Sequence, residues 1–276
     1  MATFRLADPR CYQVAVLGSL LAWGIFVLDF GIRWQNAAAI LATAQAVQWF
    51  AGRLVGVPRF DPLSALITSL SLTLLLRTDA VAVAALAAAV AIGSKFLVRI
   101  RGKHVFNPAN IALVTVTFVA DNAWVSSGQW GSAALGAFAL ACLGLLVLTR
   151  ARRAETTFAF LASFALILFA RAAWLGDPLS IPLHQLGNGA LLIFAFFMIS
   201  DPRTTPDAAA ARVVYGSLVA GVAAVIQFGF YTPNGPILAL AMLAPLVPLL
   251  DRVQRGSAYR WDRPAGMPLV HSKGDS

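Results

Sequence analysis

Long apolar stretches separated by short polar breaks run along most of this 276-residue chain. Because a membrane-spanning helix needs about 20 mostly apolar residues, the pattern predicts an all-α polytopic integral membrane protein with ten spans. The fifth and eighth stretches are short, which is typical of half-helices or re-entrant segments. The expected spans cover residues 12–32, 36–56, 62–77, 80–100, 107–120, 131–149, 156–175, 185–200, 212–231 and 234–250.

The ten spans divide into two halves of five, roughly residues 1–120 and 131–251, within a single transmembrane domain over residues 1–251. Residues 252–276 are polar and are expected to form a cytoplasmic tail. Composition agrees with a membrane domain: 59% of the residues are hydrophobic and 12% are charged, against about 45–50% and about 25% in soluble domains.

The positive charges predict the orientation of the spans. With the N-terminus inside, only Arg33, Arg77 and Arg171 of the 21 Lys and Arg residues fall in outer segments. This bias is the one that the positive-inside rule requires. We therefore expect both termini on the cytoplasmic side of a bacterial-type inner membrane. The net charge of +9 is spread between apolar segments, so it does not indicate a nucleic-acid partner.

The densest basic segment lies between the fourth and fifth spans, at residues 95–110. Gly102 permits a tight turn, Pro108 suits the first turn of a helix, and Asn107 can cap that helix. The exposed backbone N–H groups and the positive charges suit an anion such as a flavin phosphate or a lipid head group. The alternative is a loop that only sets topology. The basic side chains are Lys95, Arg99, Arg101, Lys103 and His104.

A second polar break follows the eighth span, at residues 196–206. Asp201 comes directly after an apolar run, Pro202 ends or begins a helix, and Thr204 adds a hydroxyl. Asp201 either pairs with a basic residue of the first break, joins a proton or cation path, or lies in water at a helix end. Paired interrupted segments in two halves of a membrane protein often mark a central binding site.

Other chemistry has little support in the sequence. Nucleotide-binding, serine-hydrolase and zinc-protease motifs are absent, and no Cys or His cluster indicates a metal site. We assign no catalytic residue. Several polar residues interrupt apolar stretches, and amides in such places most often tie helices together by hydrogen bonds. These residues are Asp29, Gln185, Asn188, Gln227 and Asn234.

Three stretches resemble the RnfD/NqrB family, which comprises the RnfD component of the Rnf electron-transport complex and the NqrB component of the sodium-translocating NADH:quinone oxidoreductase. They are Gly-Lys-His-Val-Phe-Asn-Pro-Ala at 102–109, Phe-Phe-Met-Ile-Ser-Asp-Pro-Arg-Thr-Thr-Pro at 196–206, and Asn-Gly-Pro-Ile-Leu-Ala-Leu-Ala-Met-Leu-Ala-Pro at 234–245. The resemblance covers about residues 62–251. It implies a membrane subunit for flavin-linked electron transport, coupled in some members to movement of Na⁺ or H⁺.

In those proteins an FMN is attached to a threonine of a Ser/Thr-rich motif. The corresponding region here, residues 126–136, contains no threonine, and Ala133 and Ala134 stand where the acidic and acceptor residues are expected. This departure argues against covalent FMN and favours a short branch like the UnbU-type membrane proteins of enediyne gene clusters. FMN or riboflavin held noncovalently remains the cofactor that the resemblance implies, with three candidates for ring stacking: Trp124, Trp130 and Trp174.

The resemblance also suggests partners, namely other subunits of a membrane redox complex. Two other functions stay open: a small-solute or ion transporter that keeps the fold without a redox cofactor, and a membrane anchor for a soluble enzyme. The cofactor-binding residues that we expect are Lys95, Arg101, Lys103, His104, Asn107, Asp201 and Thr204.

Overall fold

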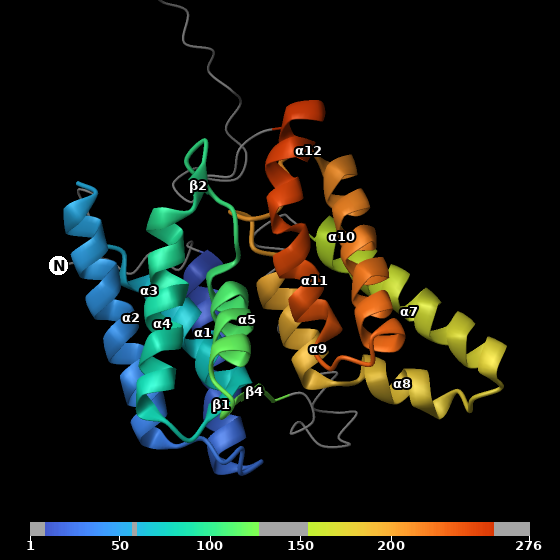
Figure 1. Cartoon of the computed structure of the whole chain (residues 1–276), viewed down its shortest axis with the longest axis horizontal. Helices are drawn as coiled ribbons and strands as arrows, with labels where there is room; N and C mark the ends of the chain where they lie inside the picture. Colours follow the sequence, from blue (N-terminus) through green and yellow to red (C-terminus); the bar gives the residue numbers. More distant parts are fainter. Residues whose placement is uncertain (1–8, 57–59, 127–153, 257–276) are drawn as a thin grey trace, which may run out of the picture.

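Helices make up most of the computed structural model, which describes residues 9–56, 60–126 and 154–256 (Figure 1). The prediction of a mostly helical chain is confirmed, whereas the total of ten spans stays a prediction. The sixth expected span, at 131–149, lies outside the described residues. The α-helices are α1 (Pro9–Phe26), α2 (Trp34–Leu54), α3 (Pro62–Leu75), α4 (Val81–Leu97), α5 (Pro108–Val119), α7 (Glu155–Leu175), α8 (Ser180–Leu186), α9 (Gly189–Ile193), α10 (Ala209–Ala224), α11 (Gly235–Leu243) and α12 (Val247–Val253).

The helices from α1 to α5 pack mainly against one another, with α4 against both α2 and α5 (Figure 1). Four alanines of α4 are fully buried in this group, namely Ala84, Ala87, Ala88 and Ala91. Small residues let helix backbones approach closely, which is how helices associate when no water is present to drive them together. The alanine-rich sequence of α4 therefore suits its place between two neighbours.

In the second group of helices, α10 packs along α7 and also against α11. The α7–α10 crossing depends on Gly216, because a Cβ atom at this position would lie 2.5 Å from the carbonyl oxygen of Thr156. The two groups meet where α11 packs against α5. This contact brings helices from the two ends of the sequence side by side in the middle of the molecule (Figure 1).

The eighth expected span is broken, as its short apolar run suggested. Its two parts, α8 and the segment from α9 through the π-helix η1 (Phe194–Met198), are bent by 47° from each other. Asn188 begins α9, and its side-chain oxygen accepts a hydrogen bond from the backbone nitrogen of Ala190 at 2.8 Å. A second π-helix, η2 (Val225–Gly229), continues α10, and the 3₁₀-helix η3 (Ala244–Leu246) joins α11 to α12.

Two small antiparallel sheets were not predicted from the sequence. The strand β1 (Leu76–Thr78) pairs with β4 (Ala123–Val125), so that Leu76 lies opposite Val125. The strands β2 (Arg99–Ile100) and β3 (Lys103–His104) form a hairpin. These strands are only two or three residues long, too short for the alternating pattern that identifies a strand in a sequence. They are located where helices of the first group end.

Three helical segments of the described chain are long and apolar enough to cross a membrane, at 155–175, 209–229 and 235–253. The bent pair of α8 with α9 and η1 would add a fourth. Four further apolar helices, α1, α3, α4 and α5, are shorter. The expected span at 36–56 corresponds to α2, which is 21 residues long but contains the polar residues Gln45, Gln48 and Arg53.

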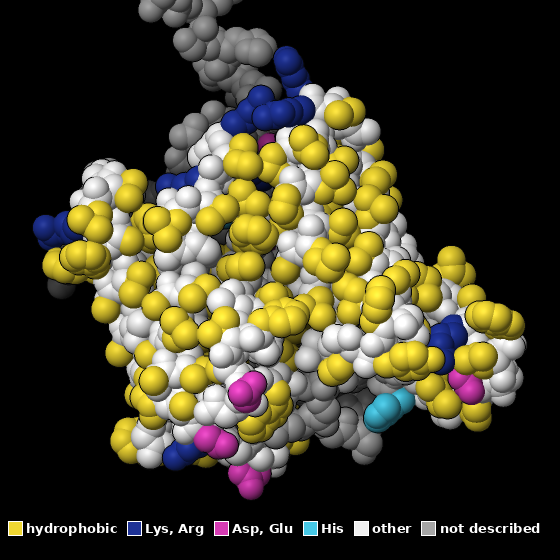
Figure 2. Space-filling model, viewed as in Figure 1, with side chains coloured by type: hydrophobic (Ala, Val, Ile, Leu, Met, Phe, Trp, Pro, Cys, Tyr) yellow, Lys and Arg dark blue, Asp and Glu magenta, His cyan; other side chains and the backbone are white. Residues whose placement is uncertain are grey.

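Hydrophobic side chains cover the middle of the surface in Figure 2, and the charged ones gather toward the ends. In this view most Lys and Arg side chains lie at the end that carries β2 and α12, whereas acidic side chains lie at the opposite end. Such an arrangement agrees with a band of lipid-facing surface between two polar faces. The more basic face is the one where the two proline-containing breaks are found.

Candidate functional site

A two-residue turn joins β2 to β3 and places the basic segment at the more basic end of the molecule. Arg99 pairs with His104 across the hairpin. The two turn residues, Arg101 and Gly102, have φ angles of +54° and +76°, and positive φ at both central residues is what a type I′ turn requires. The tight turn predicted at Gly102 is therefore confirmed.

Asn107 begins α5 and also contacts the second proline-containing turn. Its side-chain oxygen accepts a hydrogen bond from the backbone nitrogen of Asn110 at 3.0 Å, and Pro108 occupies the first helical turn. Its Nδ2 atom donates to the carbonyl oxygen of Met198 at 3.3 Å and to Oδ2 of Asp201 at 3.4 Å. The predicted cap is confirmed, and the same side chain joins the two breaks.

Asp201 organises the second turn through both its side chain and its backbone. Its Oδ1 atom accepts a hydrogen bond from the backbone nitrogen of Arg203 at 2.9 Å. Its carbonyl oxygen accepts from the backbone nitrogens of Thr204 and Thr205, both at 3.1 Å. Both threonines are buried, and the Thr204 hydroxyl donates to the same carbonyl at 3.3 Å. Asp201 is thus a turn-forming residue inside the junction, not a helix-end carboxylate in water.

The two titratable groups at this junction have pKa values shifted away from their charged forms. Burial raises the pKa of the Asp201 carboxyl, although the backbone N–H of Arg203 and the charges of Arg203 and Lys95 oppose the rise. Burial lowers the pKa of His104 to about 3, and the charges of Arg203, Arg99 and Lys95 lower it further. His104 is therefore uncharged near neutral pH and adds no positive charge for a phosphate.

Lys95 lies in the interior, at the last turn of α4. Its side chain is 4% exposed, and its ammonium group donates to Oγ and to the carbonyl oxygen of Ser64 at 3.0 and 3.1 Å. Ser64 belongs to the first turn of α3, where Asp61 caps the helix by accepting from its backbone nitrogen at 3.3 Å. Lys95 thus ties α4 to the start of α3.

Lys103 forms a three-residue charge cluster that the sequence analysis missed. Its Nζ atom lies 3.0 Å from Oδ1 of Asp207 and 2.7 Å from Oδ2 of Asp251. The other carboxylate oxygen of Asp251 accepts from the backbone nitrogen of Asp207 at 2.7 Å. All three side chains are mostly buried, with exposures of 14–18%. The cluster fixes the β2–β3 hairpin against the start of α10 and the end of α12.

A second buried ion pair was also missed. The guanidinium of Arg212 donates from Nε and Nη2 to the two carboxylate oxygens of Glu155, each at 3.2 Å. Its Nη1 atom donates to the carbonyl oxygen of Asp207 at 2.8 Å. Glu155 and Arg212 stand at the beginnings of two apolar runs far apart in the sequence. Their opposite charges on the same expected face were the only signal that could have paired them.

A cavity of about 780 Å³ lies between the hairpin and the ends of α12 and the second turn. Arg101, Lys103 and His104 of the predicted residues line it, together with Arg203 and Arg255, which were not predicted. Its apolar lining residues are Ile100, Pro202, Val247 and Pro248. Positive groups beside an apolar wall can hold an anion attached to a less polar body.

The other four predicted residues, Lys95, Asn107, Asp201 and Thr204, do not appear among the described residues that line this cavity. They build the junction beneath it through the contacts given above. Binding of a cofactor by any of the seven stays a prediction. Trp124 and Trp174 are 51% and 86% exposed and do not line this cavity either. Trp130, and the 126–136 segment beyond Ser126, lie outside the described residues.

The sequence profile of the NQR2, RnfD, RnfE family matches residues 120–260, slightly more than half of the chain. The matched region contains the turn at Asp201, α10, α11 and α12. It also includes Asp207 and Asp251 of the Lys103 cluster.

Several bacterial proteins that are similar in sequence are named as the D-type component of an ion-translocating oxidoreductase complex. The one from Tolumonas auensis is 36% identical over 81 residues, which cover 29% of this chain and 23% of that protein. The one from Escherichia coli O1:K1 is 30% identical over 140 residues, covering 50% of this chain and 35% of that protein. The one from Citrobacter koseri is 29% identical over 138 residues, with the same coverage. The aligned part thus spans about a third or less of each of these relatives.

Proposed function

The chain belongs to the NQR2, RnfD, RnfE family, and from this premise we propose that it is an integral membrane subunit of an ion-translocating electron-transport system. The observation that carries the proposal is the family match, together with the names of the similar proteins, which are components of ion-translocating oxidoreductase complexes. The apolar helices support a multi-pass membrane location. The protein acts as one component of the system, and we assign it no catalytic residue.

The partners in this proposal are other subunits of a membrane redox complex and the lipid bilayer. Large hydrophobic side chains are exposed along several helices, among them Leu166 of α7 and Met242 of α11. Exposed apolar surface of this extent suits lipid or neighbouring membrane helices. The more basic end is the cytoplasmic end in the proposed orientation, which places both termini in the cytoplasm and the protein in the inner membrane.

The cofactor in this proposal is FMN or riboflavin, held noncovalently. The cavity beside the hairpin suits the phosphate of FMN, because Arg101, Arg203 and Arg255 line it and guanidinium groups bind phosphate by paired hydrogen bonds. Ile100, Val247 and Pro248 offer an apolar wall for a ring system. When bound, a flavin supplies one- or two-electron redox chemistry, while these side chains hold and orient it. Whether the chain belongs to an UnbU-like branch stays a prediction.

The test is a visible absorption spectrum of the full-length protein, purified from membranes together with any co-expressed partner subunits. We expect a flavin that is released entirely when the protein is denatured. A purified protein without flavin, alone and with its partners, would contradict the cofactor proposal. Stable co-purification with no redox protein would contradict the proposed role as a subunit.

A pair of variants locates the flavin. Arg101→Ala and Arg203→Ala remove guanidinium groups from the cavity and should reduce the retained FMN, with a smaller effect on riboflavin, which lacks the phosphate. Arg33→Ala is the matched control, because Arg33 lies at the opposite end of the chain's helices, beside Asp79. Equal FMN content in all variants would place the flavin elsewhere in the protein.

A further inference from the structure

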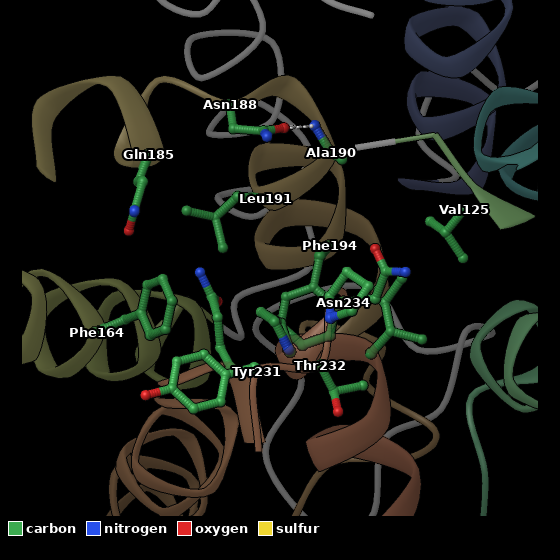
Figure 3. A pocket seen from close by; sticks show the side chains of 14 residues that line it. Val125, Phe164, Gln185, Asn188, Ala190, Leu191, Phe194, Tyr231, Thr232 and Asn234 are labelled. Carbon is green, nitrogen blue, oxygen red and sulfur yellow. Dashed lines mark hydrogen bonds between the residues drawn. The ribbon is translucent and has the colours of Figure 1, made fainter. Parts of the chain in front are cut away.

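A second cavity, of about 430 Å³, lies at the end of the molecule opposite the hairpin. It is enclosed by α7, α8, α9, η1, η2 and the start of α11, and its described lining residues include none of those that line the first cavity. Figure 3 shows Gln185 extending from α8 toward the space bordered by Phe164 and Leu191. The cavity therefore belongs to the second group of helices alone, apart from Val125 of β4.

Four carboxamide side chains line this cavity: Gln185, Asn188, Gln227 and Asn234. The sequence suggested that such amides tie helices together. Instead the structure places them around one space, and the side-chain oxygen of Gln185 is buried with no hydrogen-bond partner among the described residues. A carboxamide offers both donors and acceptors, and a buried polar atom without a partner is costly. A ligand with complementary donors and acceptors would remove that cost.

No Lys, Arg, His, Asp or Glu is found among the described residues that line the cavity. A charged ligand would lose its hydration on entering and gain no opposite charge in exchange, which is strongly unfavourable. The lining therefore selects against phosphates, carboxylates and ammonium groups. It favours an uncharged molecule that is rich in hydrogen-bonding groups.

The remaining lining is flat and apolar. Phe164 of α7 and Phe194 of η1 contribute aromatic rings, and Leu191 and Ile237 contribute aliphatic surface. Aromatic rings prefer to pack against other rings in offset or edge-to-face arrangements. Such a wall suits a planar ring more than a flexible aliphatic chain.

The backbone around the cavity departs from regular helix in several places. Phe194 and Gln227 lie in the π-helices η1 and η2, which occur mostly at functional sites. Asn234 has a φ of +65°, in the left-handed region. Irregular backbone within a membrane domain is tolerated where it is buried in protein or lines a cavity. The irregular segments here converge on the same space.

From this convergence we propose that the cavity binds a small, uncharged, planar molecule that carries amide-like hydrogen-bonding groups. This site goes beyond the electron-transport role, and neither its position nor its ligand class depends on the flavin at the other end.

Nicotinamide and nicotinate are a suitable pair of probes, because they share one ring and differ at neutral pH in carrying a neutral amide or a negative carboxylate. Binding to the full-length protein in lipid nanodiscs can be measured by saturation-transfer NMR, with empty nanodiscs as the blank. We expect saturable binding of nicotinamide with a Kd on the order of a millimolar, as a ligand of this size allows. Nicotinate should bind at least about tenfold more weakly, because its carboxylate would be buried without an opposite charge.

Two variants test the amides. Gln185→Met keeps the length of the side chain and removes its hydrogen-bonding groups. Asn234→Gly removes the carboxamide while keeping a residue that tolerates positive φ. Each should weaken nicotinamide binding about two- to tenfold, which corresponds to one neutral hydrogen bond. Gln254→Met is the control, because Gln254 is exposed at the end of α12.

Thermal unfolding of each variant checks that it is folded before binding is compared. The proposal is overturned if nicotinamide does not bind the wild-type protein up to about 50 mM, far above the expected constant. It is also overturned if nicotinate binds as well as nicotinamide, or if folded Gln185→Met and Asn234→Gly bind like the control. Loss of flavin from the first cavity would leave these outcomes unchanged, so the two proposals fail separately.

Discussion

The Nδ2 atom of Asn107 lies 3.4 Å from Oδ2 of Asp201, and this contact joins two proline-containing turns that are 94 positions apart in the sequence. The same nitrogen donates to the carbonyl oxygen of Met198, while the side-chain oxygen caps α5. One buried carboxamide therefore ends a turn, begins a helix and connects the two groups of helices.

Replacing Asn107 by alanine should destabilise the protein by about 1–3 kcal/mol, because it removes a helix cap and leaves buried polar groups without partners. Asn107→Ser keeps a capping oxygen and loses the nitrogen donor, so it separates the two contributions. We expect Asn107→Ser to fall between wild type and Asn107→Ala in thermal unfolding of the purified protein. Equal stability of all three proteins would show that the contact contributes nothing.

Lys103→Met should be strongly destabilising, since it leaves Asp207 and Asp251 close together without a positive charge. Removing one partner of a buried ion pair typically costs about 3–5 kcal/mol, and the exposures of 14–18% place this cluster near that regime. Chemical denaturation monitored by circular dichroism measures the loss.

The control for this experiment is Asp79→Asn, in an ion pair with Arg33 whose side chains are 50% (Arg33) and 75% (Asp79) exposed. An exposed pair contributes less than about 1 kcal/mol. If Lys103→Met cost no more than Asp79→Asn, the cluster would be a surface feature without energetic importance.

The stability of the protein should fall as the pH drops below about 6.5, partly because of His104. Its pKa is about 3 in the folded protein and about 6.5 in an unfolded chain, so the unfolded state binds an additional proton between these values. The stability contributed by neutral His104 is complete above the unfolded pKa and is lost as the pH falls toward 3, by up to about 1.4 kcal/mol per pH unit.

His104→Gln cannot take up this proton, so its stability should depend less on pH between 6.5 and 4 than that of the wild type. Unfolding curves at several pH values measure the difference between the two proteins. His184→Gln is the control, because His184 is exposed on α8. Parallel pH profiles for wild type and His104→Gln would contradict the low pKa.

Gly216→Val should weaken the packing of α7 against α10, because its Cβ atom would collide with the backbone of Thr156 and Phe160. Inserting atoms into a packed interface typically costs about 1–3 kcal/mol. Gly221→Ala, on the same helix, has open space around the added carbon and should be neutral or stabilising by up to about 1 kcal/mol. Thermal unfolding of the two variants should therefore shift in opposite directions or by clearly different amounts.

The orientation can be tested with single cysteines in a background where Cys11 and Cys142 are replaced by alanine. Arg101→Cys, on the exposed turn of the hairpin, should react with a membrane-impermeant maleimide only when the cytoplasmic face is accessible. Ser180→Cys, exposed at the start of α8, should react from the opposite face. Labelling of both positions from the same face would rule out the proposed arrangement.

The apolar pattern predicted the positions of the helices well, because each buried or lipid-facing helix needs a long hydrophobic run whatever it packs against. It also predicted local features that depend on a few neighbouring residues, such as the cap at Asn107 and the turn at Gly102. The short strands β1 to β4 could not be predicted, because two or three residues carry no period of their own.

The long-range contacts of the site were beyond the sequence for a different reason. Pairing Lys103 with Asp207 and Asp251 requires knowledge of which helix ends meet, and that depends on packing of α5 against α11. The amides at Gln185 and Gln227 were noticed as polar interruptions, yet only the bend between α8 and α9 shows that they border a shared space.

Lys103 and Asp251 are 148 positions apart, so the hairpin emerges from the ribosome long before the carboxylate that holds it. Until the last helix has been inserted, the hairpin lacks one of its two acidic partners and is free to sample other positions. Correct placement of the basic turn is therefore a late event in biogenesis, and a nascent chain interrupted before residue 251 should expose that turn to proteases.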